Sequence, residues 1–228
     1  MTSYHRDMKV IIPARGGSKG VPRKNIRLLN GIPLIAYPIL QAKQCERVSK
    51  IYVSTDDGEI ADIAREYEAE VIERPAEYAT DISLDIDVMR HAVGLLGSFD
   101  DLVHLRATTP LVKASVIDRA IEYFLENPHC TSLRSAHETP ETAYKYFQKN
   151  DLYWSGLFND KMEGEYYNLP RQSLPKTYHP NGYVDILKPS WFMHNNSIHG
   201  ERILAFETPY SHEVDTVDDF KILEALCG

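Results

Sequence analysis

The stretch from Pro13 to Asn25, Pro-Ala-Arg-Gly-Gly-Ser-Lys-Gly-Val-Pro-Arg-Lys-Asn, combines the residue types that bind phosphate groups. Glycines let the backbone approach a ligand closely, and consecutive amide groups can form a nest for an anion. Arg15, Ser18 and Lys19 add hydrogen-bond donors and positive charge. The pattern predicts a phosphate-binding loop, and a solvated basic surface loop is the alternative interpretation. The loop is neither a Walker motif nor a dinucleotide fingerprint, because Gly-Lys-Ser/Thr at the required spacing and Gly-x-Gly-x-x-Gly are both absent.

Carboxylates that could hold a divalent cation occur near the end of the chain. Glu213 and Asp215 alternate along an extended segment, which places both side chains on one side. Mg²⁺ prefers one or two carboxylates together with phosphate oxygens and water. The segment therefore predicts a magnesium site, and the alternative for Asp215 is an N-cap of the last helix. Asp56 and Asp57 are predicted to cap a helix rather than bind metal.

Charge is distributed unevenly along the chain. Seven basic and no acidic residues lie between Met8 and Cys45, so this part has a net charge of +7. The net charge of the whole chain is -8, so the remainder carries -15. A polyanion would be attracted to the front of the chain. The sequence pI of about 5.6 argues against broad nucleic-acid binding, so a small phosphorylated ligand is the better expectation.

The cellular setting follows from what the sequence lacks. Cys45, Cys130 and Cys227 have no CxxC spacing, which is typical of a reducing compartment. The longest stretch without charge, residues 28–42, is too short and too rich in proline and glycine to span a bilayer. The first residues lack the basic, apolar and small-residue zones that a signal peptide needs, so we expect none. We expect a cytoplasmic protein without a membrane span.

The scaffold that positions these residues is predicted to be α/β. We expect strands at residues 9–14, 50–54, 70–72, 101–105 and 131–136, and helices at residues 33–42, 57–67, 85–96, 115–124 and 217–226. Pro33 is expected in the first turn of its helix, with Pro38 distorting that helix, and Ser115 is expected to cap another. This alternation predicts a mostly parallel sheet with helices on both faces, and ligands beyond the carboxyl ends of its strands.

The 228 residues suit one domain, spanning residues 1–228, with an insertion at about 140–180. Between residues 144 and 180 the alternation stops and aromatic residues accumulate. Exposed aromatic surface usually marks an interface, so the segment predicts a projecting arm that packs against a partner subunit. The alternative is that these rings close a local core.

Five short motifs occur in order along nearly the whole chain. They are Ile12-Pro-Ala-Arg-Gly-Gly-Ser-Lys-Gly20 with Pro22-Arg-Lys-Asn25, Val53-Ser-Thr-Asp-Asp57, Arg74-Pro-Ala-Glu77, Pro170-Arg-Gln-Ser-Leu-Pro175 with Pro180-Asn-Gly182, and Val214-Asp-Thr216. In order and spacing the chain resembles the acylneuraminate cytidylyltransferases, or CMP-sialic acid synthetases. The related synthetases for the eight-carbon sugar Kdo usually open with a Tyr-Gly-Ser-Thr-Arg-like loop, so Gly17-Ser18-Lys19 favours nine-carbon acids.

The resemblance implies a Rossmann-like nucleotidyltransferase fold, a homodimer formed through the arm, and a role in making surface glycans. It also implies transfer of CMP from CTP to the anomeric hydroxyl of an acidic 2-keto sugar, with release of pyrophosphate and a need for Mg²⁺. The family's triphosphate-binding positions correspond to Arg15, Gly16, Gly17, Ser18, Lys19 and Asn25. Lys19 is interpreted as catalytic together with Asp215, and Arg74 as the contact to cytosine, with an ordinary turn residue as the alternative for Arg74.

On the sugar side, the residues that match the family are Lys145, Arg171 and Asn181, and the resemblance also places Arg106 and His179 at substrate-binding positions. Three departures are visible: Glu213-x-Asp215 in place of Asp-x-Asp, Arg106 where many members have Gln, and His179 where some have Arg. An additional guanidinium beside the sugar would change which substituents are accepted, so legionaminic, pseudaminic and sialic acids all remain possible. A solvent-facing loop residue is the alternative for His179.

Two other functions fit parts of the sequence. A sugar-1-phosphate nucleotidyltransferase would use UTP, GTP or dTTP. A non-catalytic nucleotide-binding regulator would keep residues 16–20 but would need neither Asp215 nor the sugar-side residues Arg171 and Asn181, whose presence counts against it.

Overall fold

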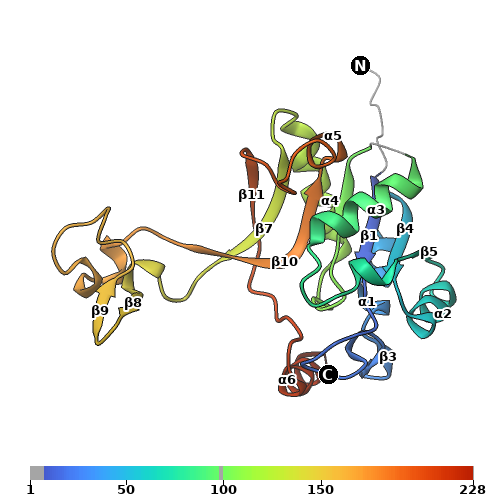
Figure 1. Cartoon of the computed structure of the whole chain (residues 1–228), viewed down its shortest axis with the longest axis horizontal. Coiled ribbons are helices and arrows are strands. Elements are labelled where there is room, and N and C mark those ends of the chain that lie inside the picture. Colours follow the sequence, from blue (N-terminus) through green and yellow to red (C-terminus); the bar gives the residue numbers. More distant parts are fainter. Residues whose placement is uncertain (1–7, 98–99, 228) are drawn as a thin grey trace.

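The computed structural model describes residues 8–97 and 100–227, and its central element is a seven-stranded sheet (Figure 1). The strands, in the order β11-β7-β10-β6-β1-β4-β5, are β11 (Ile203–Glu207), β7 (Ser132–Glu138), β10 (Tyr178–Leu187), β6 (Leu102–His104), β1 (Met8–Pro13), β4 (Val48–Thr55) and β5 (Glu70–Glu73). Every neighbouring pair is parallel except those of β10, which runs antiparallel to both β6 and β7. The predicted mostly parallel sheet is confirmed, whereas β10 and β11 were not predicted.

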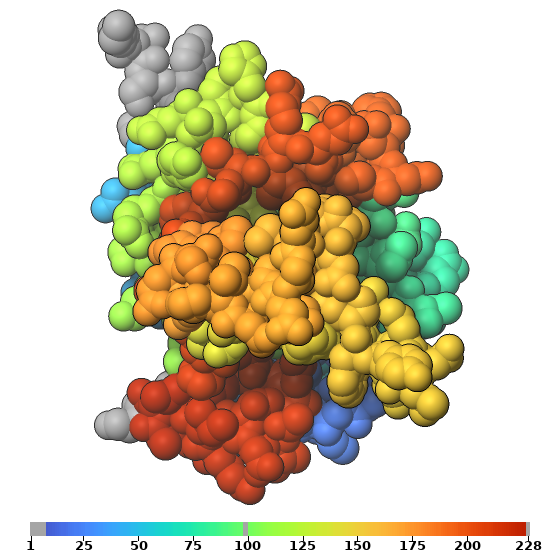
Figure 2. Space-filling view, turned by 90° about the vertical axis from the view of Figure 1, so that its left-hand side faces the viewer, coloured from blue at the N-terminus to red at the C-terminus, as the bar shows by residue number. Residues whose placement is uncertain are grey.

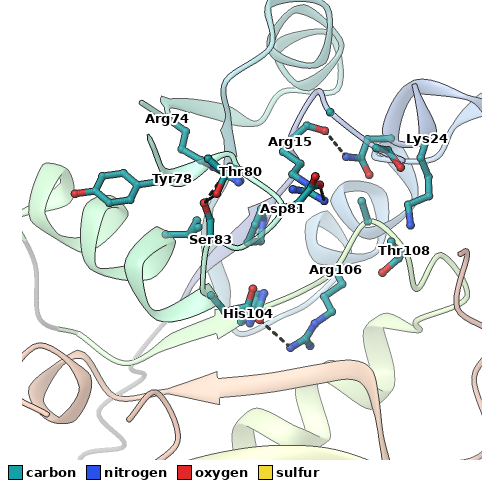
Figure 3. A pocket seen from close by; sticks show the side chains of 17 residues that line it. Arg15, Lys24, Arg74, Tyr78, Thr80, Asp81, Ser83, His104, Arg106 and Thr108 are labelled. Atoms are coloured by element: carbon teal, nitrogen blue, oxygen red, sulfur yellow. Dashed lines mark hydrogen bonds and ion pairs between the residues drawn. The ribbon is translucent and has the colours of Figure 1, made fainter. Parts of the chain in front are cut away.

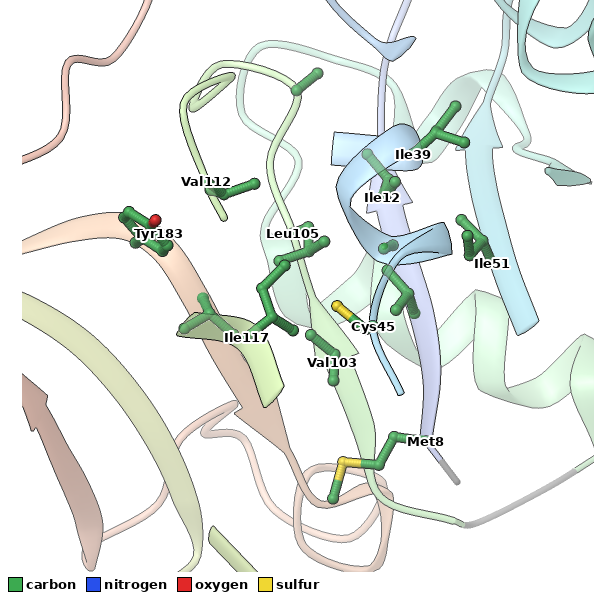
Figure 4. Packing of buried hydrophobic residues seen from close by; sticks show 14 of the residues in the cluster. Met8, Ile12, Ile39, Cys45, Ile51, Val103, Leu105, Val112, Ile117 and Tyr183 are labelled. Carbon is green, nitrogen blue, oxygen red and sulfur yellow. The ribbon is translucent and has the colours of Figure 1, made fainter. Parts of the chain in front are cut away.

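Helices cover both faces of this sheet, as the alternating strand and helix pattern predicts. Val10 and Ile12 of β1 belong to a core cluster with α1 (Ala36–Lys43), α2 (Gly58–Glu66) and α4 (Ala114–Glu126), part of which is drawn in Figure 4. Ile11 points to the opposite face, where it packs with α3 (Asp85–Leu96) and α5 (Pro189–Phe192). Successive side chains of a strand alternate between faces, so β1 is buried on both.

A third, smaller core joins residues 21–34 to residues 214–223. Val21 and Leu29 pack against Val214 and against Phe220 of α6 (Val217–Cys227). Leu29 belongs to a short hairpin of β2 (Leu28–Leu29) and β3 (Ile32–Pro33). Residues 21–29 follow the glycine-rich residues 15–20 of the predicted phosphate-binding loop, which we call the phosphate loop. This core holds them beside residues 213–215, the C-terminal acidic segment. No helix within the described residues is both long and apolar enough to cross a membrane.

Two local predictions about helix starts are wrong. Pro33 lies in β3, and α1 begins only at Ala36. Pro38 therefore falls in the first turn, where a backbone N–H has no helical partner, so it does not interrupt the helix. Nor does Ser115 cap α4, which begins at Ala114.

Instead, α4 is capped by residues that are distant in sequence. The Ala114 N–H donates to Oε1 of Gln41, at 3.0 Å. The Lys113 N–H donates to the hydroxyl of Tyr183, at 2.8 Å. A cap supplied by a neighbouring helix and strand satisfies the same free backbone donors as a local one, but it leaves no local sequence signal.

The aromatic segment forms an extension that projects away from the sheet (Figure 1). Its hairpin consists of β8 (Phe147–Asn150) and β9 (Tyr153–Gly156), and its 3-10 turns are η3 (Ala143–Lys145), η4 (Tyr166–Asn168) and η5 (Arg171–Ser173). Some rings close a local core: Tyr144 stacks on Phe158 with ring centroids 4.4 Å apart, and Tyr166 is buried. Others, including Tyr153 and Trp154, are exposed. In Figure 2 this segment, yellow to orange, stands in front of the rest of the molecule.

Candidate active site

A cavity of about 310 Å³ opens beyond the carboxyl ends of β1, β5 and β6 (Figure 3). Its walls come from the phosphate loop, from η1 (Lys24–Ile26), and from the chain between β5 and α3 with the first turn of α3. The last residue of β6 and residues 106–108 complete them. Ligands of open α/β sheets bind at this edge, where strand ends leave a crevice. The predicted location of the site is therefore matched by a cavity.

Asp56 and Asp57, which follow β4, both lie against Gly16 of the phosphate loop. The Gly16 N–H donates to Oδ1 of Asp56 at 2.9 Å, and the Ile60 N–H donates to Oδ1 of Asp57 at 3.0 Å. A Cβ on Gly16 would lie 2.6 Å from Oδ2 of Asp57, so no side chain fits there without a shift. Asp57 thus caps α2, as predicted. Its pKa is lowered, chiefly by hydrogen bonds from Arg23.

The basic side chains of the loop converge on one carboxylate. Nη2 of Arg15 lies 2.9 Å from Oδ1 of Asp81, and Nζ of Lys19 lies 2.6 Å from Oδ2. Arg15, Gly17 and Ser18 line the cavity, whereas Lys19 is not among its lining residues and has 84% of its side chain exposed. Asn25 donates from Nδ2 to the carbonyl of Arg15, at 2.9 Å. Asn25 therefore shapes the loop, while direct contacts of these residues to a nucleotide remain predictions.

Arg74 is buried, with 7% of its surface exposed, and lines the cavity. Its Nε donates to the hydroxyl of Ser54 at 3.2 Å, and its Nη2 donates to the Ser54 carbonyl. Burial lowers its pKa. Ser54 thus fixes the guanidinium at the cavity wall, and its contact with cytosine stays a prediction beside the alternative of an ordinary turn residue.

The C-terminal acidic segment lies directly against the phosphate loop. Nζ of Lys24 donates to the carbonyl of Val214 at 2.8 Å and lies 3.3 Å from Oδ1 of Asp215. A Cβ on Gly20 would lie 2.6 Å from the Asp215 carbonyl oxygen. The Val214 N–H donates to the carbonyl of Thr108, at 2.8 Å. The two regions expected to act together are therefore adjacent.

Asp215 itself does not cap the last helix. Asp219 accepts hydrogen bonds from the backbone N–H groups of Asp215 and Thr216, at 2.9 and 2.7 Å. The Asp219 N–H in turn donates to Oγ1 of Thr216. This reciprocal pair satisfies backbone N–H groups at the start of α6. The Asp215 carboxylate is 74% exposed and lies beside Lys24. The alternative interpretation of Asp215 as an N-cap is wrong.

Two carboxylates are available for a divalent cation here. Asp215 is exposed, and Glu213 is partly buried, which raises its pKa. A Cβ on Gly182 would lie 3.1 Å from Oε1 of Glu213, so that carboxylate faces β10. The described residues hold no group of three or more His, Cys, Asp or Glu arranged as a metal site. Neither carboxylate lines the cavity, and because the other ligands of Mg²⁺ are commonly phosphate oxygens and water, the magnesium site stays a prediction.

The sugar-side residues divide into those near the cavity and those on the extension. Arg106 lines the cavity, and its Nη2 lies 2.9 Å from Oδ2 of Asp185 and 3.6 Å from Oδ2 of Asp85. Lys145 and Arg171 do not line this cavity. They lie in η3 and η5, and Arg171 borders a separate cavity of about 430 Å³ where it pairs with Glu138.

Asn181 and His179 occupy different surroundings on β10. Asn181 is 1% exposed and its amide is already engaged, because Nδ2 donates to the hydroxyl of Thr208 and Oδ1 accepts from Ser135. It holds the backbone of β10 in place, and a direct sugar contact remains a prediction. His179 is exposed and lies against His137, with ring centroids 5.7 Å apart.

Several residues of the cavity wall were not predicted. They are Lys24, Tyr78, Thr80, Asp81, Ser83, Asp85, Val88, His104, Ala107 and Thr108. Lys24 stands within the Pro22-Arg-Lys-Asn25 motif, and its charge was a usable signal. Asp81 carried none, because an aspartate in the connection between a strand and a helix is ordinary in sequence and its role depends on long-range contacts.

A phosphate loop after the first strand, a buried arginine beyond β5 and an acidic segment beside that loop define a nucleotidyltransferase of α/β fold. The sequence profile of the cytidylyltransferase family matches residues 9–223, and the chain belongs to this family.

The chain is similar to curated proteins along most of its length. It is 36% identical over 225 residues to CMP-N,N'-diacetyllegionaminic acid synthase of Campylobacter jejuni and to post-translational flagellin modification protein B of Campylobacter coli, covering 94% of this chain and 92% of each relative. It is 31% identical to the N-acylneuraminate cytidylyltransferase of Escherichia coli, of which it spans about half. Its fold is similar to that of CMP:2-keto-3-deoxy-manno-octonic acid synthetase complexed with CTP, with a TM-score of 0.73 at 17% identity, covering 96% and 98% of the two chains.

Proposed function

We propose that this protein transfers CMP from CTP to the anomeric hydroxyl of a nine-carbon 2-keto acid sugar and releases pyrophosphate. The observation that carries the proposal is the contact between the phosphate loop and the acidic segment, made by Lys24 with Asp215 and by Gly20 with the Asp215 carbonyl. Relatives named for legionaminic and N-acylneuraminic acids support an acidic sugar as the acceptor.

In this reaction the anomeric oxygen attacks the α-phosphorus, and the bond from that phosphorus to the bridging oxygen of the β-phosphate breaks. The hydroxyl proton is lost to solvent or to a nearby base, and pyrophosphate leaves. Such a transfer depends on positioning and on charge stabilisation. Arg15, Ser18 and Lys19 supply donors and positive charge for the phosphate oxygens, while Arg74 donates to the acceptor edge of cytosine.

The family typically uses Mg²⁺, and we propose that Asp215, with Glu213, holds this ion. When bound, Mg²⁺ neutralises phosphate oxygens and favours departure of pyrophosphate. Lys24 pairs with Asp215 at 3.3 Å and keeps the carboxylate beside the phosphate loop.

A pyrophosphate-release assay tests the proposed function. The purified protein is incubated with Mg²⁺, one nucleoside triphosphate and one sugar from a panel of legionaminic, pseudaminic, N-acetylneuraminic and Kdo acids. We expect release with CTP and a nine-carbon acid, because the donors of Arg74 suit cytosine. Release with UTP, GTP or dTTP and a sugar 1-phosphate would identify the rival transferase instead, and nucleotide binding without release would identify a regulator.

We further propose a homodimer formed through the arm at about residues 140–180. At its hairpin the neighbouring residues Leu152, Tyr153 and Trp154 are 87%, 77% and 69% exposed, so large apolar side chains gather on the surface of the arm. Lys145 and Arg171 lie on this arm and do not line the active-site cavity of about 310 Å³ in their own chain. In the proposed dimer, Lys145 and Arg171 reach the active-site cavity of the partner subunit and bind the acidic sugar there.

The Trp154→Asp variant is expected to be monomeric, because a charge at the centre of an apolar interface is not solvated there. We expect light scattering to show a dimer for the wild type and half that mass for the variant, with CMP transfer lost and CTP binding retained. Leu95→Asp is the control, since Leu95 on α3 is 64% exposed and lies off the arm. A monomeric wild type, or an unchanged mass for Trp154→Asp, contradicts the proposed interface.

A further inference from the structure

Asp81 occupies the position at which the phosphate loop would hold an anion. Its two carboxylate oxygens are each paired with a different cation of the loop, Oδ1 with Arg15 at 2.9 Å and Oδ2 with Lys19 at 2.6 Å. Its pKa is lowered, first by the hydrogen bond from Lys19. Carboxylate and phosphate oxygens accept the same hydrogen bonds from these side chains, so the two groups compete for them.

The segment that carries Asp81 is attached to the loop mainly through this aspartate. Within residues 79–84 the other hydrogen bonds are local: the Thr80 N–H donates to Oγ of Ser83, and that hydroxyl donates to the carbonyl of Glu77. Ile82 and Leu84 are 88% and 62% exposed. Thr80, Asp81 and Ser83 line the cavity in Figure 3. A segment with few buried contacts and local hydrogen bonds is easily displaced.

We propose that Asp81 is a positioning residue that holds Arg15 and Lys19 in place of the triphosphate, and that CTP displaces it from both. This inference rests on the proposed function, because it assumes that these two cations bind the triphosphate. The triphosphate carries several negative charges and forms more charge-assisted hydrogen bonds than one carboxylate can. A bound triphosphate also repels Asp81, so displacement releases residues 79–84 from the phosphate loop.

Two consequences follow for the enzyme without nucleotide. The internal ion pairs hold Lys19, which is 84% exposed, beside Asp81. They also reduce the apparent affinity for CTP, since only the population with Asp81 displaced can bind it fully. Removing the negative charge of Asp81 therefore strengthens nucleotide binding.

The Asp81→Asn variant tests this inference by calorimetry with CTP and, separately, with inorganic tripolyphosphate. We expect the Kd of both ligands to fall by about three- to tenfold, since exposed ion pairs of this kind are each worth a factor of a few. Asp81→Glu retains the charge and is expected to stay close to the wild type. Asp62→Asn, which removes an exposed aspartate paired with Arg65, is the matched control for net charge and should leave both Kd values unchanged.

Hydrogen exchange gives a second measurement. In the wild type, CTP should increase exchange of the amides at residues 79–84, and in Asp81→Asn this segment should already exchange faster without ligand. An unchanged or weaker affinity in Asp81→Asn, or ligand-induced protection of residues 79–84 in the wild type, overturns the inference. Tighter tripolyphosphate binding in a protein that proves not to transfer CMP supports the inference and refutes only the proposed function.

Discussion

The Lys19→Ala variant is expected to transfer CMP about a hundred- to a thousandfold more slowly than the wild type, the range seen when one preorganised charge-stabilising donor is removed. Lys19 is the exposed ammonium of the phosphate loop, and it pairs with Asp81, a residue that lines the cavity. Negative charge accumulates on the phosphate oxygens and on the leaving pyrophosphate during transfer. An ammonium that follows this charge lowers the barrier more than it strengthens ground-state binding, so kcat should fall more than the KM for CTP rises.

Single-turnover kinetics at saturating CTP measures this effect, with circular dichroism to verify folding. Lys50→Ala is the control, because Lys50 is an exposed lysine paired with Glu70 away from the cavity. The double variant Lys19→Ala with Asp81→Asn separates two explanations. If Lys19 acts only by neutralising Asp81, the double variant recovers activity. If Lys19 acts on the phosphates, it remains slow, and a wild-type rate in Lys19→Ala refutes the assigned role.

Patterns that depend on neighbours in sequence predicted the local structure well. The helical spacing between Asp85 and Leu96 matches α3, and Asp57 caps α2 as its position after a strand indicates. The glycines of the phosphate loop follow β1 as expected for a ligand-binding turn. Each of these features is determined by periodicity or by turn chemistry over a few residues, which a single sequence contains.

Features determined by distant residues were missed or only partly interpreted. Strand β10 runs antiparallel between β6 and β7, and strand order is not encoded in the local pattern of any one strand. Gln41 replaces a local cap at the start of α4. On the sugar side, the residue types of Arg106 and Asn181 were suited to substrate contacts. Their partners, Asp185 and Thr208, are visible only in three dimensions, and they show that part of each side chain's hydrogen-bonding capacity is already used.

The same distinction applies to the central feature of the site. The sequence predicted a phosphate loop and an acidic segment as separate motifs, and their joint action was an expectation from the family resemblance. The structure brings them into contact through Lys24 and Gly20, at a separation of 191 residues between Lys24 and Asp215. The small core formed by Val21, Val214 and Phe220 fixes this contact, so its packing positions the charged groups.

Asp215→Asn is the second variant for which we expect a large loss, of about a hundred- to a thousandfold in kcat/KM at a fixed Mg²⁺ concentration. The substitution keeps the shape of the side chain but removes the charge that holds a divalent cation. The backbone of the segment should not move, because Asp219 accepts the N–H groups of residues 215 and 216 and Val214 is bound to Thr108. The loss should therefore appear in metal dependence and not in stability.

A titration of activity with Mg²⁺ distinguishes a metal ligand from a mere partner of Lys24. If Asp215 holds the ion, the Mg²⁺ concentration for half-maximal activity rises by at least about tenfold in Asp215→Asn, and Asp215→Glu recovers part of the activity. If Asp215 only orients Lys24, the Mg²⁺ midpoint stays at its wild-type value while the rate falls, and the metal assignment is wrong. Asp218→Asn is the matched control, because Asp218 is an exposed aspartate of α6 paired with Lys221. It removes the same charge three residues away, so a comparable shift there would indicate a general electrostatic effect instead of coordination.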